Sequence, residues 1–148
     1  MEVPSDKIYE LFNFCYDQAK SMLQEAGGFN PFGALLTPAL ELNAVRADLG
    51  DSQPDQKDIY QALDKALQEQ TQNNDIVASA LACDVNIPEK HEPPSRDGLR
   101  VHVVSQGLSR YIYVPYRMES GEDGNDVTFF EPFTVDLHPH ILGDLTQN

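Results

Sequence analysis

Five side chains able to bind an anion or a partner protein gather in one short part of the chain: Arg100, His102, Tyr111, Tyr113 and Arg117. A two-residue turn at residues 106–107 would pair the flanking stretches as a hairpin and place these side chains mainly on one side of it. Guanidinium groups beside aromatic rings can hold an anionic group or an acidic protein segment. We therefore expect either a site for a protein partner or a small anionic ligand, or cross-strand pairs that stabilise a solvated sheet face.

A second group of side chains could hold a metal ion. Asp136, His138 and His140 occupy alternate positions, so an extended strand would project one oxygen and two nitrogen ligands to the same side. Pro139 disfavours a regular strand here, and no Glu-x-x-His motif or cysteine pair supplies further ligands. We favour surface residues over a metal site, and we expect no cofactor.

The sequence contains no pattern that assigns a catalytic residue. A Gly-x-Ser-x-Gly nucleophile turn is absent. Cys15 and Cys83 fall at apolar positions of a predicted helix and a predicted strand, which is typical of buried free thiols rather than a disulfide or a catalytic pair. An enzyme whose site is assembled from distant residues would leave no such motif. A small-molecule enzyme therefore stays as one alternative.

The charge balance limits the partners. The chain has 24 acidic and 10 basic residues, a formal net charge of −14, which opposes binding to nucleic acid or to an anionic membrane. No run approaches the roughly 18 apolar residues of a membrane-spanning helix, and residues 1–6 show no basic-then-apolar signal. We therefore expect a soluble, bacterial-like cytoplasmic protein. The acidic excess also allows an immunity or inhibitor protein that neutralises a basic partner.

The candidate side chains need a scaffold, and its centre is the apolar run 75–87. No glycine or proline interrupts this run. Alternate positions place large residues such as Leu81 on one side and the small residues Ala78, Ala80 and Ala82 on the other. The spacing predicts a central strand, covered on both sides or nearly so, with a helix close to the alanine side.

Other alternating patterns predict the strands around this centre. They are a hairpin over residues 34–49, a second hairpin over residues 99–118 and a last strand around residues 133–137. Pro115 disfavours a fully paired ladder at its position, since proline has no backbone N–H to donate. The acidic stretch 119–126 is typical of a connection between strands.

Periodic apolar residues predict two helices, one from about residue 5 to the glycines at 27–28, and one from an N-cap at Ser52 to residues 73–74. The resulting order, α-β-β-α-β-β-β, predicts one α+β domain over residues 1–137 and a C-terminal tail over residues 138–148. We expect a mostly antiparallel sheet of five to six strands with both helices packed on one face. This order is similar to the roadblock and profilin-like arrangements, a resemblance that implies an interaction scaffold.

These observations favour a small cytoplasmic binding or interaction protein without catalytic activity. Its partner would be another protein or a small anionic ligand, held by the side chains at positions 100 to 117 named above. A homodimer joined through an uncovered sheet face or sheet edge is one arrangement that the fold allows. The acidic inhibitor and the enzyme are the alternatives.

Overall fold

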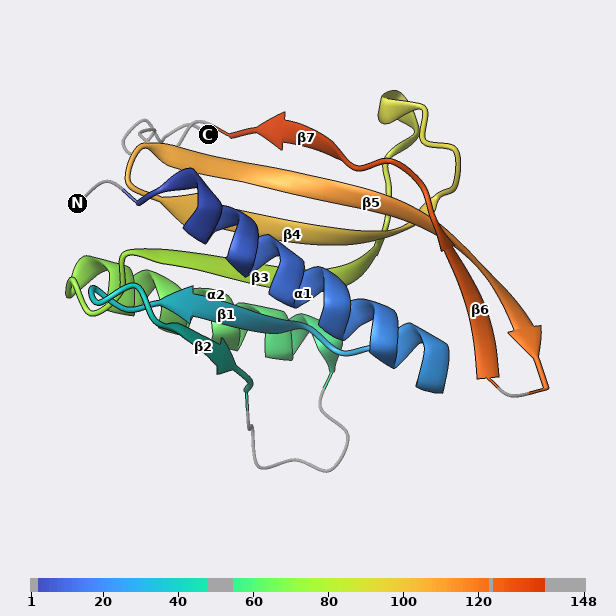
Figure 1. Ribbon diagram of the computed structural model, residues 1–148, viewed down its shortest axis with the longest axis horizontal. Coiled ribbons are helices and arrows are strands. Elements are labelled where there is room, and N and C mark those ends of the chain that lie inside the picture. The colour runs from blue at the N-terminus through green and yellow to red at the C-terminus, as the bar shows by residue number, and fades with distance from the viewer. Residues whose placement is uncertain (1–2, 48–54, 123, 138–148) are drawn as a thin grey trace.

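The computed structural model describes residues 3–47, 55–122 and 124–137 of the 148-residue chain. Within these ranges the chain forms two α-helices, one 3-10 turn and seven strands (Figure 1). In chain order they are α1 (Ser5–Ala26), β1 (Phe32–Leu36), β2 (Leu42–Val45), α2 (Gln56–Gln72), β3 (Ala78–Asn86), η1 (Glu89–His91), β4 (Asp97–Ser105), β5 (Leu108–Gly121), β6 (Gly124–Phe129) and β7 (Phe133–Asp136). The predicted α+β class is confirmed.

The strands form one antiparallel sheet in the order β2-β1-β3-β4-β5-β6, and β7 also pairs with β5. The predicted central strand is confirmed, because β3 lies between β1 and β4. The predicted register of the second hairpin is confirmed as well, since Ser105 is paired with Leu108 and Arg100 with Tyr113. This register places the candidate residues of β4 and β5 side by side.

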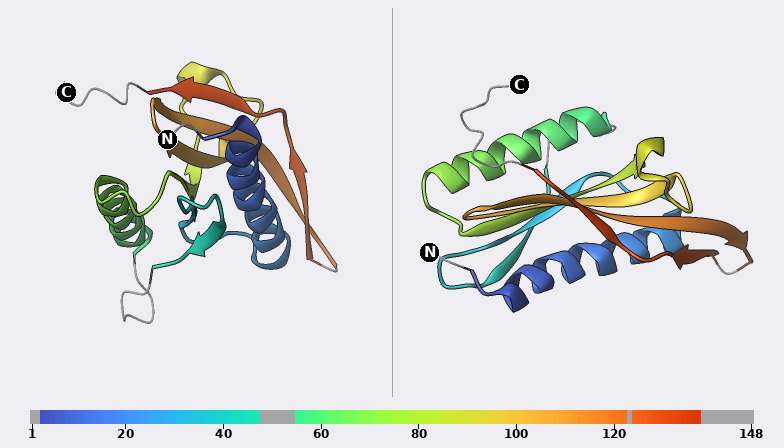
Figure 2. Two further views of the ribbon diagram at one scale, coloured as in Figure 1. Left: turned by 60° about the vertical axis from the view of Figure 1, so that its left-hand side comes forward. Right: turned by 90° about the horizontal axis from the view of Figure 1, so that it is seen from above.

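The two helices lie on opposite faces of the sheet, so the expectation that both pack on one face is wrong (Figure 2). α1 packs against the side of β3 that carries Ala78, Ala80 and Ala82. α2 packs against the side that carries Leu81. The physical reason is that β1 is buried along its whole length and β3 along most of its length. A strand with apolar side chains on both of its sides needs cover on both faces of the sheet.

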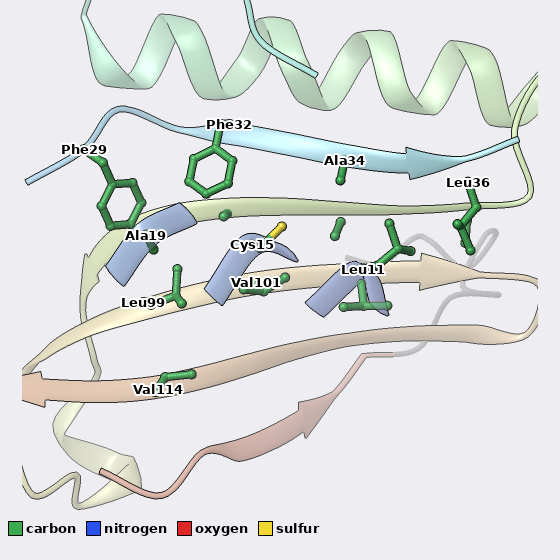
Figure 3. Packing of buried hydrophobic residues seen from close by; sticks show 14 of the residues in the cluster. Leu11, Cys15, Ala19, Phe29, Phe32, Ala34, Leu36, Leu99, Val101 and Val114 are labelled. Atoms are coloured by element: carbon green, nitrogen blue, oxygen red, sulfur yellow. The ribbon is translucent and has the colours of Figure 1, made fainter. Parts of the chain in front are cut away.

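The larger core lies between α1 and the sheet. Figure 3 shows Leu11, Cys15 and Ala19, one turn apart on α1, among side chains of the strands that include Ala34 and Val101. All five residues are fully buried. The stripe at spacing i, i+4 that predicted this helix is therefore the stripe that it buries.

The sheet has seven strands among the described residues, against five to six expected, because residues 119–126 are not a plain connection. β5 continues to Gly121 and pairs with β6. Val127 and Phe129 on β6 pack against the α1 core, which gives this ribbon an apolar face to bury. The alternation was hidden because the intervening residues are acidic or small.

Pro115 marks the place where β5 changes partners. Residues 110–113 of β5 pair with β7, and residues 116–121 pair with β6. The carbonyl of Pro115 accepts a hydrogen bond from the N–H of Phe130, in the segment that joins β6 to β7. Proline offers no N–H on this edge, so the switch between partners leaves no donor unpaired there.

The helix ends follow the sequence in part. α1 is followed by Gly27 at φ 78°, in the left-handed region predicted for a glycine C-cap. α2 has Asp55 as its N-cap, whose carboxylate accepts a hydrogen bond from the N–H of Lys57 at 3.2 Å. The expected cap, Ser52, lies outside the described residues.

Candidate functional site

The candidate residues lie on the face of the sheet that α2 covers in part. α2 packs mainly on β1 and β3 and reaches β4 through Tyr60, and neither α-helix among the described residues covers β5 and β7 on that side (Figure 2). The side chains there form a connected group of rings around one guanidinium, which we call the Arg100 face. Its members are Tyr60, His91, Arg100, His102, Tyr111, Tyr113 and Phe133.

Arg100 is the centre of this face. Its guanidinium carbon lies 4.3 Å from the centre of the Tyr111 ring and 5.5 Å from the centre of the Tyr60 ring. Its Nη2 donates a hydrogen bond to the Tyr60 hydroxyl at 3.1 Å, whereas its Nε has no hydrogen-bond partner. Two aromatic faces therefore fix the position of the guanidinium, and its buried Nε–H has no hydrogen-bond partner.

Two groups beside Arg100, Tyr60 and Cys83, are neutral at physiological pH. Burial raises the pKa of Tyr60 to about 12, although Arg100 acts in the opposite direction. Burial also raises the pKa of the Cys83 thiol, again against the effect of Arg100. In the described part of the chain, Arg100 forms no ion pair with a carboxylate. Its positive charge is therefore not neutralised by a direct partner.

His102 extends the face along β4. Its ring packs edge-to-face with the Tyr111 ring, at 5.1 Å between ring centres, and its Nε2 lies 3.0 Å from the Ser109 hydroxyl oxygen. Burial lowers the pKa of His102, and Arg100 lowers it further, while Asp64 on α2 opposes both. The ring is therefore neutral at physiological pH and adds no second positive charge to the face.

Tyr113 is buried, at 5% exposure, although the sequence predicted that this side of the hairpin points outward. The rings of His91 and Phe133 cover it. Tyr113 stacks on Phe133 at 5.2 Å between ring centres, and His91 lies 5.6 Å from Tyr113 and 5.5 Å from Phe133. Tyr113 is thus the buried part of the Arg100 face. Its partly exposed part consists of Arg100, His102 and Tyr111.

Sequence reasoning missed three members of the face: Tyr60, His91 and Phe133. Tyr60 follows Ile59 on α2, and no periodic signal tells whether such a flanking residue reaches the sheet. His91 lies in a proline-rich stretch without apolar periodicity. Phe133 could have been placed, because its alternation with Val135 predicted a strand, but the partner of that strand was not predictable.

Arg117 is not part of this group. It is exposed, and its guanidinium lies 5.9 Å from the centre of the Phe130 ring. It sits four residues beyond Tyr113 on β5, about 13 Å along an extended chain. The structure therefore brings together four of the five expected residues.

The three weighed metal ligands are not assembled in the described residues. Asp136 has its Oδ1 3.1 Å from Nε of Arg110, an ion pair in which Asp136 is largely exposed. His138 and His140 lie outside the described residues. No group of three His, Cys, Asp or Glu side chains within the described ranges is placed to hold a metal ion.

Both cysteines are free and buried, as predicted. Burial raises the pKa of Cys15 to about 12. The two thiols are therefore protonated at physiological pH, and a protonated, buried thiol is a poor nucleophile. The Arg100 face can bind an anion or stack a planar group, and nothing in its described geometry activates a nucleophile.

Comparison of the chain with protein-family models, with curated proteins and with solved structures found no match. The resemblance in element order to roadblock and profilin-like arrangements thus stays a prediction. Neither helix of the described chain is long and apolar enough to cross a membrane.

Proposed function

We propose that this chain is a binding protein that recognises an acidic segment of a partner protein through the Arg100 face. The observation that carries the proposal is the position of Arg100, held between Tyr60 and Tyr111 without a carboxylate partner among the described residues. Arginine and tyrosine are the residue types that concentrate at the centres of protein interfaces. A carboxylate docking there would pair with the positive charge of the guanidinium.

The order of Arg100 before binding favours this role. A free arginine side chain loses rotamer freedom when it docks, at a cost of about 0.5 to 1.5 kcal/mol. The two rings and the Tyr60 hydroxyl already restrict this guanidinium. Less of that cost therefore remains to be met on binding.

The shape of the surface favours a protein segment over a small molecule. One hollow of about 470 Å³ lies beside Pro38, Thr71 and Val104, and another of about 620 Å³ lies between α1 and the sheet. Arg100 lines neither of them. A small ligand is usually enclosed by its site, whereas an open face of rings suits an extended chain.

The proposal is tested with a fluorescein-labelled hexaglutamate peptide and fluorescence anisotropy at about 0.15 M ionic strength, where salt screens the repulsion between the peptide and the net charge of −14. We expect saturable binding that Arg100→Met weakens at least tenfold, about 1.4 kcal/mol. Arg117→Met is the matched control, because it removes one positive charge from the neighbouring strand β5, outside the face. Equal losses for the two variants would mean that only net charge matters and would contradict the proposal, as would no binding to the wild-type protein.

A second candidate, an acidic inhibitor of a basic partner, is favoured by the net charge of −14. In that case labelled hexalysine binds tightly, its affinity falls steeply with salt, and Arg100→Met leaves it unchanged. The two peptides therefore separate the two functions in one assay.

A further inference from the structure

A second candidate site lies on the opposite face of the sheet from Arg100. It is a groove of about 620 Å³ between the first turns of α1 and the strands β4, β5 and β7. This volume is in the range of small-molecule sites. We call it the α1 groove.

The walls of the α1 groove are mainly apolar. Ile8 and Phe12 of α1 face Leu108 and Ile112 of β5 across it. All four are only partly buried, although they pack against the core. Tyr9, at the same groove, is 68% exposed, the one large hydrophobic residue found so exposed in the described ranges. Apolar surface left open around a hollow is typical of a ligand site.

One cation stands in this apolar surrounding. Among the described residues that line the groove, Arg110 is the only positively charged one and Glu131 the only negatively charged one. Nε of Arg110 is buried and has no well-directed hydrogen bond, although Asp136 Oδ1 lies 3.1 Å away. Because Asp136 is 75% exposed, water screens this pair, and the guanidinium keeps donors for another anion.

The start of α1 adds to the same preference. Its N-cap is Pro4, and no side chain caps the first turn. Ser5 of that turn lines the groove. Uncapped N–H groups at a helix N-terminus carry a partial positive charge, which favours an anionic group nearby. Asp6 in the same turn already supplies one negative charge, so the contribution to ligand binding is small.

We propose that the α1 groove binds a small amphipathic carboxylate of the fatty-acid class. The aliphatic chain lies between α1 and β5, against Phe12 and Ile112, and the carboxylate binds the guanidinium of Arg110. Glu131 is exposed and solvated at the groove, so its charge opposes the ligand only weakly. The site is independent of the proposed function of the Arg100 face, because the two lie on opposite faces of the sheet.

The test uses isothermal titration calorimetry of the full chain with octanoate and with octan-1-ol, which share the chain and differ in the charged head. We expect octanoate to bind about tenfold more tightly than octan-1-ol, the effect of one partly exposed ion pair. Equal affinities, or no octanoate binding at millimolar concentration, would overturn the proposal.

Variants locate the site. Arg110→Met should remove the advantage of octanoate, whereas Arg117→Met, the loss of one positive charge outside both sites, should leave it unchanged. Glu131→Gln should tighten octanoate binding and spare octan-1-ol. If Arg110→Met does not fold, Arg110→Gln takes its place, and an advantage of octanoate that persists in that variant would place the carboxylate elsewhere and overturn the proposal.

Discussion

The hydroxyl of Tyr116 donates a hydrogen bond of 2.7 Å to Oδ1 of Asp84, between the β5 and β3 strands that β4 separates. Tyr116 is buried in the α1 core, and Asp84 is half-buried at its margin. This bond supplies the buried hydroxyl with an acceptor and the carboxylate with a donor. Removing the donor with Tyr116→Phe should destabilise the fold by roughly 1.5 to 3 kcal/mol, as for other hydrogen bonds to charged groups. Urea unfolding at pH 7 measures it, and a loss below 0.5 kcal/mol would contradict the assignment.

The same pair predicts a dependence of stability on pH. Burial raises the pKa of Asp84 above its ordinary value of 3.8, the Tyr116 hydrogen bond lowers it, and Asp97 raises it again. Because the folded pKa is raised, the folded state binds the proton more tightly than the unfolded state. The contribution of Asp84 to stability is therefore complete below the unfolded pKa and is lost as pH rises through the folded pKa.

Asp84→Asn should remove this loss, because the amide oxygen can still accept the Tyr116 hydrogen bond and carries no charge. We expect the variant to gain stability relative to the wild-type protein as the pH rises from 3.8 toward 7. Thermal unfolding at a series of pH values checks this. A variant that loses stability against the wild-type protein over that range would show that the charged form is preferred in the fold.

Gly33 should tolerate no side chain, because a Cβ atom there would lie 2.8 Å from the backbone oxygen of Ala80 on the neighbouring strand. Backbone in the centre of the sheet cannot move aside, so we expect Gly33→Ala to destabilise by about 1 to 3 kcal/mol. Gly28→Ala is the control, since nothing lies within 4 Å of its added Cβ. Chemical unfolding of both variants decides, and equal stabilities would count against the tight approach of β1 to β3.

Both thiols should be inert in the folded protein. Cys15 is 0% exposed and Cys83 is 7% exposed, and burial raises the pKa of each. We expect no reaction with Ellman's reagent at pH 8 before unfolding, and two thiols per chain in denaturant. Rapid labelling of native Cys15→Ala would show that Cys83 is open to solvent and would contradict its position beside Arg100.

The sequence predicts much of the fold and part of the site, for reasons that differ between elements. The register of Arg100 with Tyr113 was predictable, because a two-residue turn and period-two alternation fix it. The faces of the helices were not, since an amphipathic helix signals that it covers a sheet but not which side. The burial of β1 and β3 on both sides carried that information, because helices on one face of the sheet alone would leave the apolar side chains of the other face exposed.

The burial of Tyr113 escaped prediction for a related reason. Alternation places a side chain on a face, but cover by a distant segment depends on tertiary packing. His91 and Phe133 reach this ring from the 3-10 turn and from β7. The 3-10 turn carries no periodic signal, and the alternation in β7 predicts a strand but not its partner.

The availability of the Arg100 guanidinium to an acidic segment is tested most directly by its own Nε–H resonance. In ¹⁵N-labelled protein, this signal is assigned by its loss in Arg100→Met and followed during titration with unlabelled hexaglutamate. We predict a progressive, saturable shift of the Arg100 signal with little change at Arg117. An Arg100 signal that stays fixed at millimolar peptide, or an equal shift at both arginines, would contradict the account.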